Sequence, residues 1–448
     1  MLVFLLILAG GMGFFLTEYS QKAQDWVTFR GSPHVYQGTT NVAAIVTDRE
    51  GNLLLDTTDG RKYAGDLALR QSTLHWLGDR NGSISATALN SYAAALVGFD
   101  SLQGIYNYTK DPGSMQLTIS GRVQTVALKA LNGRKGTVAV YNYKTGQILC
   151  AVTTPTFDPD NMPDIAGDTS GAWEGVYLNR FTQVTYPPGS IFKVVAAAAA
   201  IDCVEGIWDM TFPCDGNYEL QGSRVTCEAA HGNVNLKSAL ANSCNCAFAQ
   251  IAQLIGSDRL AEYVERYGIT DSISFDGITT AAGNFDLAGA DQVALAWSAI
   301  GQYTDMINPC TFLNFMGAIG AGGQGAVPYI VERVTAGGEI TYQAQAKLGQ
   351  QIMDSEMAET LTDMMRSNVV NVYGAGNFPG LTVCAKSGTS ELGGGKTPNA
   401  MFAGFVADGA YPLAFIVVVE NGGYGSSTCI PILSKVLAAC KEVMDGKG

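Results

Sequence analysis

The chain has 448 residues, of which 47% are hydrophobic and 15% are charged, and its formal net charge is −13. This composition excludes an intrinsically disordered chain, because enough apolar surface is present to bury a core, and the length accommodates two or three domains. The acidic balance argues against nucleic acid as a partner, since neutralising phosphates requires clustered Lys and Arg.

The first predicted element is the uncharged, apolar segment Leu2–Leu16. A helix of this length extends about 22 Å, which is less than the roughly 30 Å of a bilayer's hydrocarbon core. A cleaved signal peptide is one alternative, but no basic residue precedes the segment and no clear cleavage site follows it. A buried core helix is the other alternative. We predict a membrane anchor over residues 1–16.

The next region, residues 17–115, has mixed and mostly short patterns. Residues 41–58 predict a hairpin of two short strands around Arg49-Glu50-Gly51. Residues 60–112 contain short segments separated by Gly and Asp turns. We therefore predict a small, irregular N-terminal pedestal domain over residues 17–115.

The pattern changes near residue 116. Residues 117–133 have helical spacing, and residues 136–155 predict a β-hairpin. Helical patterns dominate the middle of the region, and its end returns to three strand-like runs and an amphipathic helix. We predict one α+β domain over residues 116–448, in which a sheet built from both ends of the domain carries an inserted helical lobe.

Cysteine and histidine patterns indicate no metal site. None of the ten cysteines forms a C-x-x-C pair, so zinc-ribbon and thioredoxin-like sites have no support. Cys244 and Cys246 form a C-x-C beside a helical run, which is typical of two small packing residues. Cys214 and Cys227 flank a Gly-rich, hairpin-like stretch, and the sequence leaves open whether they form a disulfide outside the membrane. No histidine lies in a nucleophile-elbow context, among His34, His75 and His231.

The first chemically informative motif is Ser190 and Lys193, the single S-x-x-K of the chain. A break at Pro187-Pro188-Gly189 precedes it and predicts a helix start at or near Ser190. Spacing of three places both side chains on one helix face. A serine nucleophile needs a base, and a lysine serves if its apolar flanks desolvate it and lower its pKa. Taken alone, this motif is more often an N-cap Ser with a surface Lys.

The second motif is Ser243-Cys244-Asn245, the single S-x-N of the chain, at a predicted helix–loop junction. A second hydroxyl, on Ser243, can relay protons between nucleophile and leaving group. The Asn245 amide can hold both a catalytic lysine and a substrate carbonyl. Taken alone, this motif is an ordinary helix cap.

The third motif is Lys386-Ser387-Gly388-Thr389, which follows a strand-like run. Lys386 supplies positive charge, while Ser387 and Thr389 supply hydroxyls, and these groups suit a substrate carboxylate. We expect Gly388 to let substrate backbone approach closely. The backbone N–H groups of Ser190 and Thr389 are the predicted oxyanion donors.

Two similar sequences are predicted to be turns and not part of the site. Lys144-Thr145-Gly146 lies in the turn of the predicted hairpin at residues 136–155, ahead of the nucleophile. Lys396-Thr397 follows a run of glycines and has no strand before it.

The order of the three motifs, S-x-x-K, S-x-N and K-[ST]-G, is that of the penicillin-recognising serine enzymes. The chain resembles a class B penicillin-binding protein, and the resemblance covers most of its length. It is weak in the N-terminal region, where it rests on VTDREGNLLL and LGDRNG. Elsewhere it is carried by the segments KTGQILCAVTTPTFDP, LNRFTQVTYPPGSIFK, AIGQYTDMINPCTFLNFMGAIGAGG, MFAGFVAD and IVVVEN.

This resemblance implies a fold with a five-stranded antiparallel sheet flanked by helices and an all-helical lobe. It implies that Ser190 attacks the D-Ala–D-Ala carbonyl of a peptidoglycan stem peptide, that Lys193 takes its proton, and that an amine of a second stem peptide resolves the acyl-enzyme. Ser243 and Asn245 would relay protons and orient the donor. Lys386, Ser387 and Thr389 would bind the terminal carboxylate.

The resemblance also implies partners and a location. β-Lactams would be covalent inhibitors, and no metal or cofactor would be needed. The region before residue 116 is too short for the family's glycosyltransferase domain, so a separate glycan polymerase is expected as a partner. The catalytic domain would lie on the extracytoplasmic face of a single-pass membrane protein.

Three other functions stay open at this point. A serine β-lactamase on the same fold would need a base that activates water, and Glu174 is the nearest upstream candidate. A D,D-carboxypeptidase would use water as the acceptor. A penicillin sensor or inactive scaffold, the alternative of another class, would usually carry a signalling module or lack one of the motifs.

Overall fold

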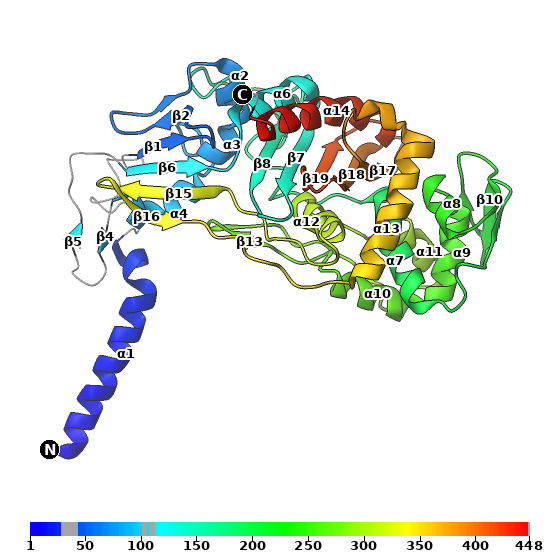
Figure 1. Ribbon diagram of the computed structural model, residues 1–448, viewed down its shortest axis with the longest axis horizontal. Helices are drawn as coiled ribbons and strands as arrows, with labels where there is room; N and C mark the ends of the chain where they lie inside the picture. Colours follow the sequence, from blue (N-terminus) through cyan, green and yellow to red (C-terminus); the bar gives the residue numbers. More distant parts are fainter. Residues whose placement is uncertain (28–43, 98, 101–104, 107–112, 447–448) are drawn as a thin grey trace.

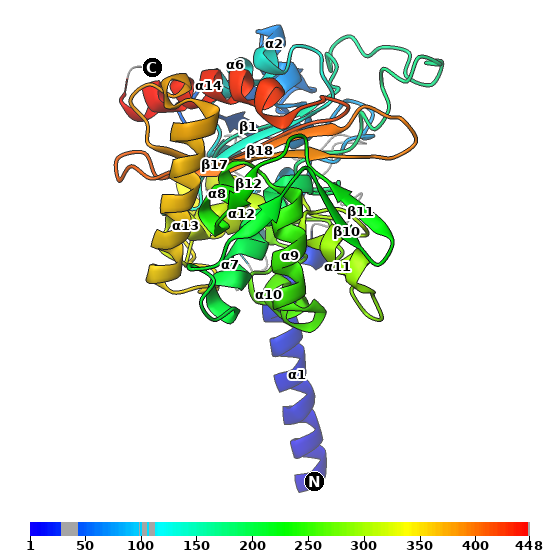
Figure 2. The same ribbon diagram turned by 90° about the vertical axis from the view of Figure 1, so that its right-hand side faces the viewer.

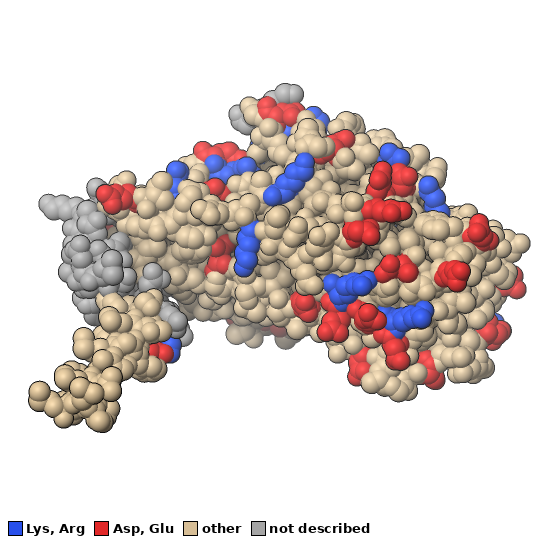
Figure 3. Space-filling view, turned by 60° about the horizontal axis from the view of Figure 1, so that its bottom comes forward, with Lys and Arg blue, Asp and Glu red and all other residues tan. Residues whose placement is uncertain are grey.

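The computed structural model describes residues 1–27, 44–97, 99–100, 105–106 and 113–446. The N-terminal helix α1, Leu2–Val27, extends away from the body of the protein (Figure 1). Its window Leu2–Ser20 is long and apolar enough to cross a membrane, and none of it is buried. Figure 3 shows an uncharged surface along the outer part of the helix, away from the body. The helix is therefore longer than the segment predicted from the sequence.

A six-stranded sheet forms the end of the body from which α1 extends, in the order β16-β15-β6-β1-β2-β3 (Figure 1). The predicted hairpin at residues 41–58 is confirmed, since β1 and β2 pair antiparallel. Two strands of the sheet come from far along the chain, which the sequence did not indicate. The strands are β1 Ala44–Thr47, β2 Leu53–Asp56, β3 Lys62–Tyr63, β6 Gly113–Leu117, β15 Val331–Ala336 and β16 Glu339–Gln343.

The central sheet has five antiparallel strands in the order β17-β18-β19-β7-β8. Strands β7 and β8 come from the beginning of the predicted domain and strands β17, β18 and β19 from its end, as the sequence indicated. Nearly every residue of these strands is buried, because helices cover both faces. The strands are β7 Gly136–Asn142, β8 Ile148–Thr154, β17 Val383–Ser390, β18 Asn399–Val406 and β19 Leu413–Val419.

Two helices cover one face of the central sheet and the helical lobe covers the other (Figure 1). The first face packs against α6, Gly121–Leu131, and α14, Gly425–Met444. The opposite face packs against α12, Pro309–Gly320. Both layers of helices are needed for stability, since a sheet with two apolar faces must bury both of them. The predicted α+β architecture is confirmed.

The helical lobe lies at the end of the body opposite α1 (Figure 1) and faces the viewer in Figure 2. Its middle is not entirely helical, because residues 212–234 form two small antiparallel pairs, β9–β12 and β10–β11. The hairpin predicted between Cys214 and Cys227 is one of these pairs. The lobe contains α7 Lys193–Cys203, β9 Phe212–Cys214, β10 Asn217–Leu220, β11 Ser223–Thr226, β12 Gly232–Val234, α8 Leu236–Ala241, α9 Asn245–Ile255, α10 Ser257–Arg266, α11 Gln292–Ala299 and α13 Ser355–Asn368.

Short elements complete the described part of the chain. They are α2 Leu67–Ser72, α3 Leu74–Leu77, α4 Thr87–Ser91, α5 Ala93–Leu96, β4 Phe99–Asp100, β5 Ile105–Tyr106, η1 Gly189–Phe192, β13 Ser274–Phe275, β14 Ile278–Thr279, η2 Val369–Tyr373 and η3 Ala375–Asn377. Residues 28–43, which include His34 and part of the predicted pedestal, lie outside the described residues.

Candidate active site

Ser190 lies in a tight turn that the neighbouring glycine makes possible. The 3-10 turn η1 spans Gly189–Phe192, and the α-helix α7 begins only at Lys193. The helix thus starts three residues later than the sequence indicated. Gly189 has a φ of +55° and a Cβ there would lie 2.7 Å from the carbonyl oxygen of Thr389. The turn therefore passes directly against the strand that carries the third motif, which only glycine allows.

Lys193 is the centre of a hydrogen-bond network within the site. Its Nζ lies 3.0 Å from Ser190 Oγ, 2.7 Å from the carbonyl oxygen of Ser243 and 2.6 Å from Asn245 Oδ1. The side chain is fully buried. Burial lowers the pKa of Lys193 well below its ordinary value, and the nearby Lys386 lowers it further. A buried lysine in contact with a serine hydroxyl is suited to accept the hydroxyl's proton.

Ser243 lies between α8 and α9 and has the left-handed φ of +53°. This backbone conformation turns the chain so that Ser243 Oγ accepts hydrogen bonds from both buried lysines, Lys193 at 3.2 Å and Lys386 at 3.0 Å. Asn245, at the first position of α9, donates from Nδ2 to the carbonyl oxygen of Thr226 at 2.8 Å. The amide is thereby oriented so that its oxygen faces Lys193.

The third motif lies on β17, which is an edge strand of the central sheet. Lys386 is fully buried, and its Nζ contacts the carbonyl oxygen of Ser387 at 2.9 Å as well as Ser243 Oγ. Burial lowers the pKa of Lys386 to about 7. Ser387 and Thr389 are partly exposed. An edge strand of the sheet thus carries a lysine and two partly exposed hydroxyls, which suit the terminal carboxylate of a peptide.

Gly388 lies against the turn that carries the nucleophile. A Cβ at this position would lie 3.0 Å from both Ile191 Cγ2 and the carbonyl oxygen of Pro188. The missing side chain therefore allows the nucleophile's turn to pack against β17. Close approach of substrate backbone to Gly388, which the sequence suggested, stays a prediction.

Tyr373 is a site residue that the sequence analysis missed. It ends the single π-helical turn η2, and it is buried. Its hydroxyl accepts from the backbone N–H of Ser387 at 3.0 Å and from Lys386 Nζ at 3.4 Å, and it also contacts Ser387 Oγ at 3.0 Å. No motif surrounds this tyrosine, so only the tertiary packing of η2 against β17 reveals it.

The two similar sequences and the alternative base candidate Glu174 lie away from the three motifs. Lys144-Thr145-Gly146 forms the turn between β7 and β8, as predicted. Lys396 lies in the turn between β17 and β18. Glu174 is exposed and pairs with Lys135 at 3.2 Å, so its carboxylate is engaged at the surface and contacts none of the motif residues. Within the described part of the chain, the hydrogen bonds of Ser190 and Lys193 involve no histidine and no carboxylate. The Glu228 carboxylate acts on Lys193 only through its charge, which partly offsets the lowering of that lysine's pKa by burial.

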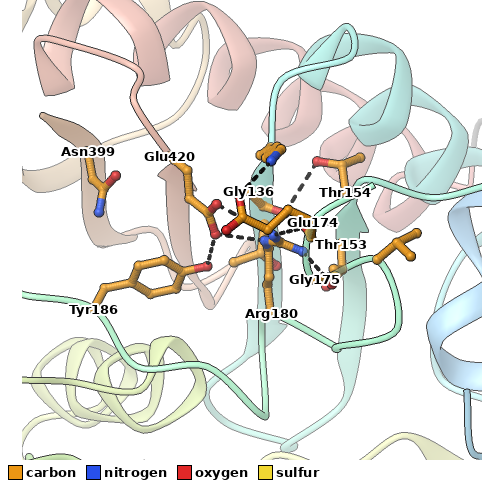
Figure 4. A network of polar contacts seen from close by, with 12 residues as sticks. Gly136, Thr153, Thr154, Glu174, Gly175, Arg180, Tyr186, Asn399 and Glu420 are labelled. Atoms are coloured by element: carbon orange, nitrogen blue, oxygen red, sulfur yellow. Dashed lines mark hydrogen bonds and ion pairs between the residues drawn. The ribbon is translucent and has the colours of Figure 1, made fainter. Parts of the chain in front are cut away.

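A second polar network, shown in Figure 4, supports the segment that leads to Ser190. Arg180 is 4% exposed, and its Nε lies 2.7 Å from the carboxylate of Glu420, which follows β19. Tyr186 donates from its hydroxyl to the same carboxylate at 2.8 Å. Burial and the adjacent Glu420 raise the pKa of Tyr186, so its hydroxyl stays protonated and keeps donating. This network ties the approach to the nucleophile to the central sheet.

We expect Arg180→Ala to lower the free energy of unfolding by about 3–5 kcal/mol, because it leaves the Glu420 carboxylate, whose side chain is only 20% exposed, without its charged partner. The measurement is urea unfolding followed by circular dichroism. The matched control is Arg224→Ala, which removes the exposed pair of Arg224 and Glu219 and should cost less than about 1 kcal/mol. Equal effects of the two substitutions would contradict a stabilising role for the buried pair.

The family described as "Penicillin binding protein transpeptidase domain" matches residues 136–438. The chain is 29% identical over 366 residues to the peptidoglycan D,D-transpeptidase PbpA of Mycolicibacterium smegmatis, an alignment that covers 74% of this chain and 73% of the relative. It is 28% identical over 357 residues to stage V sporulation protein D of Bacillus subtilis, covering 74% of this chain and 54% of that protein.

Solved structures agree with this match. The crystal structure of PBPA from Mycobacterium tuberculosis superposes with a TM-score of 0.75 at 24% identity, over 90% of this chain and 100% of that one, which shows the shared fold. The D,D-transpeptidase domain of a peptidoglycan glycosyltransferase from Eggerthella lenta superposes with a TM-score of 0.75 at 25% identity, over 90% of this chain and 98% of that chain. The family match spans the central sheet, the helical lobe and all three motifs, so the chain belongs to the penicillin-binding proteins, as a class B member.

Proposed function

We propose that this protein is a peptidoglycan D,D-transpeptidase that works through an acyl-enzyme on Ser190. The observation that carries the proposal is the contact of Ser190 Oγ with the buried Lys193 amine, inside a site that also holds Ser243, Asn245 and Lys386. Homologues named peptidoglycan D,D-transpeptidases support the same activity.

In the first half of the reaction, Ser190 Oγ attacks the carbonyl carbon of the D-Ala–D-Ala bond. Neutral Lys193 takes the hydroxyl proton, and backbone N–H groups of Ser190 and Thr389 stabilise the oxyanion. The C–N bond then breaks, and the proton passes to the departing D-Ala nitrogen. Ser243 Oγ, which both lysines contact, is the proposed relay for that proton.

In the second half, the amine of another stem peptide attacks the ester carbonyl and loses its proton through the same groups, while Ser190 regains its own. Lys386, Ser387 and Thr389 bind the terminal carboxylate of the donor before acylation. Asn245 orients the donor and holds Lys193. β-Lactams take the place of the donor and acylate the same serine. A separate glycan polymerase is the proposed partner that supplies the strands.

Two alternatives are less well supported. A β-lactamase needs a carboxylate or another base placed to activate water, and Glu174 is engaged with Lys135 at the surface. A sensor or scaffold would not need the buried lysine pair that the site contains. A D,D-carboxypeptidase differs only in its acceptor and is distinguished by product analysis in the presence of an added amine.

The test of the proposal is covalent labelling of full-length protein with a fluorescent penicillin. We expect one adduct per chain, located on Ser190 by peptide mapping, and no labelling of Ser190→Ala. Ser238→Ala is the control, since Ser238 caps α8 away from the lysines. An adduct on another serine, or undiminished labelling of Ser190→Ala, would refute the assignment.

We propose that the chain is organised as a membrane anchor at residues 1–16, a pedestal at 17–115 and a transpeptidase domain at 116–448, with the transpeptidase domain outside the cytoplasm. Support comes from the exposed apolar surface of α1, which has no partner within the described body that would bury it. Strands β15 and β16 add to the pedestal's sheet although they belong to the later region.

We expect deletion of residues 1–20 to release the protein from membranes while penicillin labelling is retained, because α1 packs no part of the site. The measurement is labelling of soluble and membrane fractions after cell lysis, and protease accessibility in spheroplasts reports the side of the membrane. Full-length protein found uncleaved in the soluble cytoplasmic fraction would contradict the proposed topology.

A further inference from the structure

Beside the second motif, three cysteines and one histidine come together from separate parts of the lobe. Cys214 ends β9, Cys227 follows β11, His231 precedes β12, and Cys244 precedes α9. One ligand atom from each of these four residues lies within 4.8 Å of all the others. Two of the four are buried and two are half-buried, so the cluster is largely shielded from solvent. The three cysteines are free of disulfides.

The distances in this cluster match those of a tetrahedral metal site. With Zn–S bonds of about 2.3 Å and Zn–N bonds of about 2.0 Å, the edges of the tetrahedron measure about 3.5–3.8 Å. Cys227 Sγ lies 3.8 Å from Cys244 Sγ, and Cys214 Sγ lies 3.4 Å from His231 Nδ1. The sulfurs are too far apart for a disulfide, which needs about 2.05 Å.

Backbone N–H groups already point at two of the sulfurs. Cys227 Sγ accepts from the N–H of Cys246 at 3.3 Å, and Cys244 Sγ accepts from the N–H of Ala247 at 3.4 Å. Such donors stabilise the negative charge of thiolates, and hydrogen bonds around the ligands orient metal sites in general. Packing of neutral thiols alone does not require this arrangement. Cys246 contacts Cys227 at 3.5 Å but lies outside the set of four.

From these observations we propose that Cys214, Cys227, His231 and Cys244 bind one Zn²⁺ as a closed, structural site. A Cys₃His set is typical of structural zinc, and soft thiolates disfavour Mg²⁺ and Ca²⁺. The proposal departs from the sequence expectation of no metal, in which Cys244 was a packing residue. The ligand spacings match no common zinc motif, so only the tertiary structure brings the four residues together.

The position of the site gives the metal a mechanical role. Cys244 lies between Ser243 and Asn245, and Cys227 follows Thr226, whose carbonyl oxygen holds the Asn245 amide. A metal bound to both cysteines would join the small strands of residues 212–234 to the turn that carries the second motif. We infer that zinc positions Ser243 and Asn245 without contacting substrate. This role rests on the proposed function, whereas zinc binding itself does not.

The test begins with the metal content of full-length protein, purified in detergent under reducing conditions without chelator. We expect about one zinc per chain. Cys214→Ser and His231→Gln should lose most of it, and the control Cys203→Ser, a half-buried cysteine outside the cluster, should retain it. If the variants fail to fold, as judged by circular dichroism, zinc content of the parent and reconstitution with Zn²⁺ after chelation still decide the question.

Chelated parent protein should be acylated by penicillin about 10- to 10²-fold more slowly, and added Zn²⁺ should restore the rate, because small displacements of positioned groups are costly. Protein that contains no zinc and takes up none after reduction would overturn the proposal. A disulfide between two of the three cysteines, seen as two fewer free thiols by mass spectrometry, would also overturn it. A zinc-loaded protein that penicillin does not acylate would refute the proposed function and leave the metal site standing.

Discussion

Replacing Lys193 with alanine should slow penicillin acylation of Ser190 by about 10²- to 10⁴-fold, the usual effect of losing a general base. The Lys193 amine lies 3.0 Å from Ser190 Oγ and is fully buried. Burial and the nearby Lys386 lower its pKa, which populates the neutral amine that can accept a proton. Without this amine, the hydroxyl has no other base among its described contacts.

The pH dependence of acylation follows from the same shifts. The rate should rise with pH through the lowered pKa of Lys193, because only the neutral amine is a base. Recognition of the substrate carboxylate should weaken above the Lys386 pKa of about 7, because that lysine then loses its charge. The parent should therefore show a bell-shaped profile, and Lys193→Ala should lose the rising limb.

The measurement is the second-order rate of acylation by a fluorescent penicillin from low to high pH. Thermal melting is needed as a control, since the substitution also leaves Asn245 Oδ1 and the carbonyl oxygen of Ser243 without their shared donor. Lys237→Ala, at an exposed position of α8, is the matched substitution and should leave the rate unchanged. A Lys193→Ala rate within about threefold of the parent's, far from the usual general-base effect, would exclude Lys193 as the base.

The penicilloyl-enzyme should persist, with decay more than about 10³-fold slower than the roughly 1 s⁻¹ at the low end of ordinary enzyme rates. Hydrolysis of this ester requires a base that activates water near Ser190. Among the described residues, Lys193 donates hydrogen bonds to Ser190, Ser243 and Asn245. No described carboxylate accepts a hydrogen bond from Ser190 or Lys193. Glu174 is occupied by Lys135 at the surface.

The decisive experiment follows nitrocefin hydrolysis at excess substrate together with decay of the labelled band. We expect one burst equivalent to the enzyme concentration and then negligible turnover. A further control tests whether the acylated site is merely blocked. The acyl-enzyme formed from a depsipeptide substrate should decay faster when an amino acceptor is added. Sustained turnover at about 1 s⁻¹ or faster would move the protein to the β-lactamases.

Local patterns predicted most of the regular elements near the site. The strands β18 and β19 are mostly apolar runs, which are typical of strands buried on both faces, and β17 begins with the apolar residues 383–385. Pro187, Pro188 and Gly189 marked the turn before Ser190, although the first turn proved to be 3-10 and not α-helical. The order of S-x-x-K, S-x-N and K-[ST]-G indicated the family, because three short motifs that are unspecific alone become specific when they occur together in one order.

Other features depended on contacts between distant residues. Strands β15 and β16 join the N-terminal sheet because β15 pairs with β6, more than two hundred positions earlier in the chain. Tyr373 contacts Lys386 and Ser387 only because η2 packs against β17. Neither contact leaves a periodic pattern in the sequence, since side-chain periodicity reports the face that a segment buries and not its partner.

By itself, the sequence determined the nature of the chemistry in this protein: a serine and a lysine three positions apart, an S-x-N, and a K-S-G on a strand. Only the tertiary structure decided how these groups act on one another. It buries Lys193 and Lys386 on either side of the Ser243 hydroxyl, and this burial lowers the pKa of both lysines through desolvation. It also gathered the zinc-ligand candidates around Cys244, since their spacings carry no local signal and their distances depend on how the lobe folds.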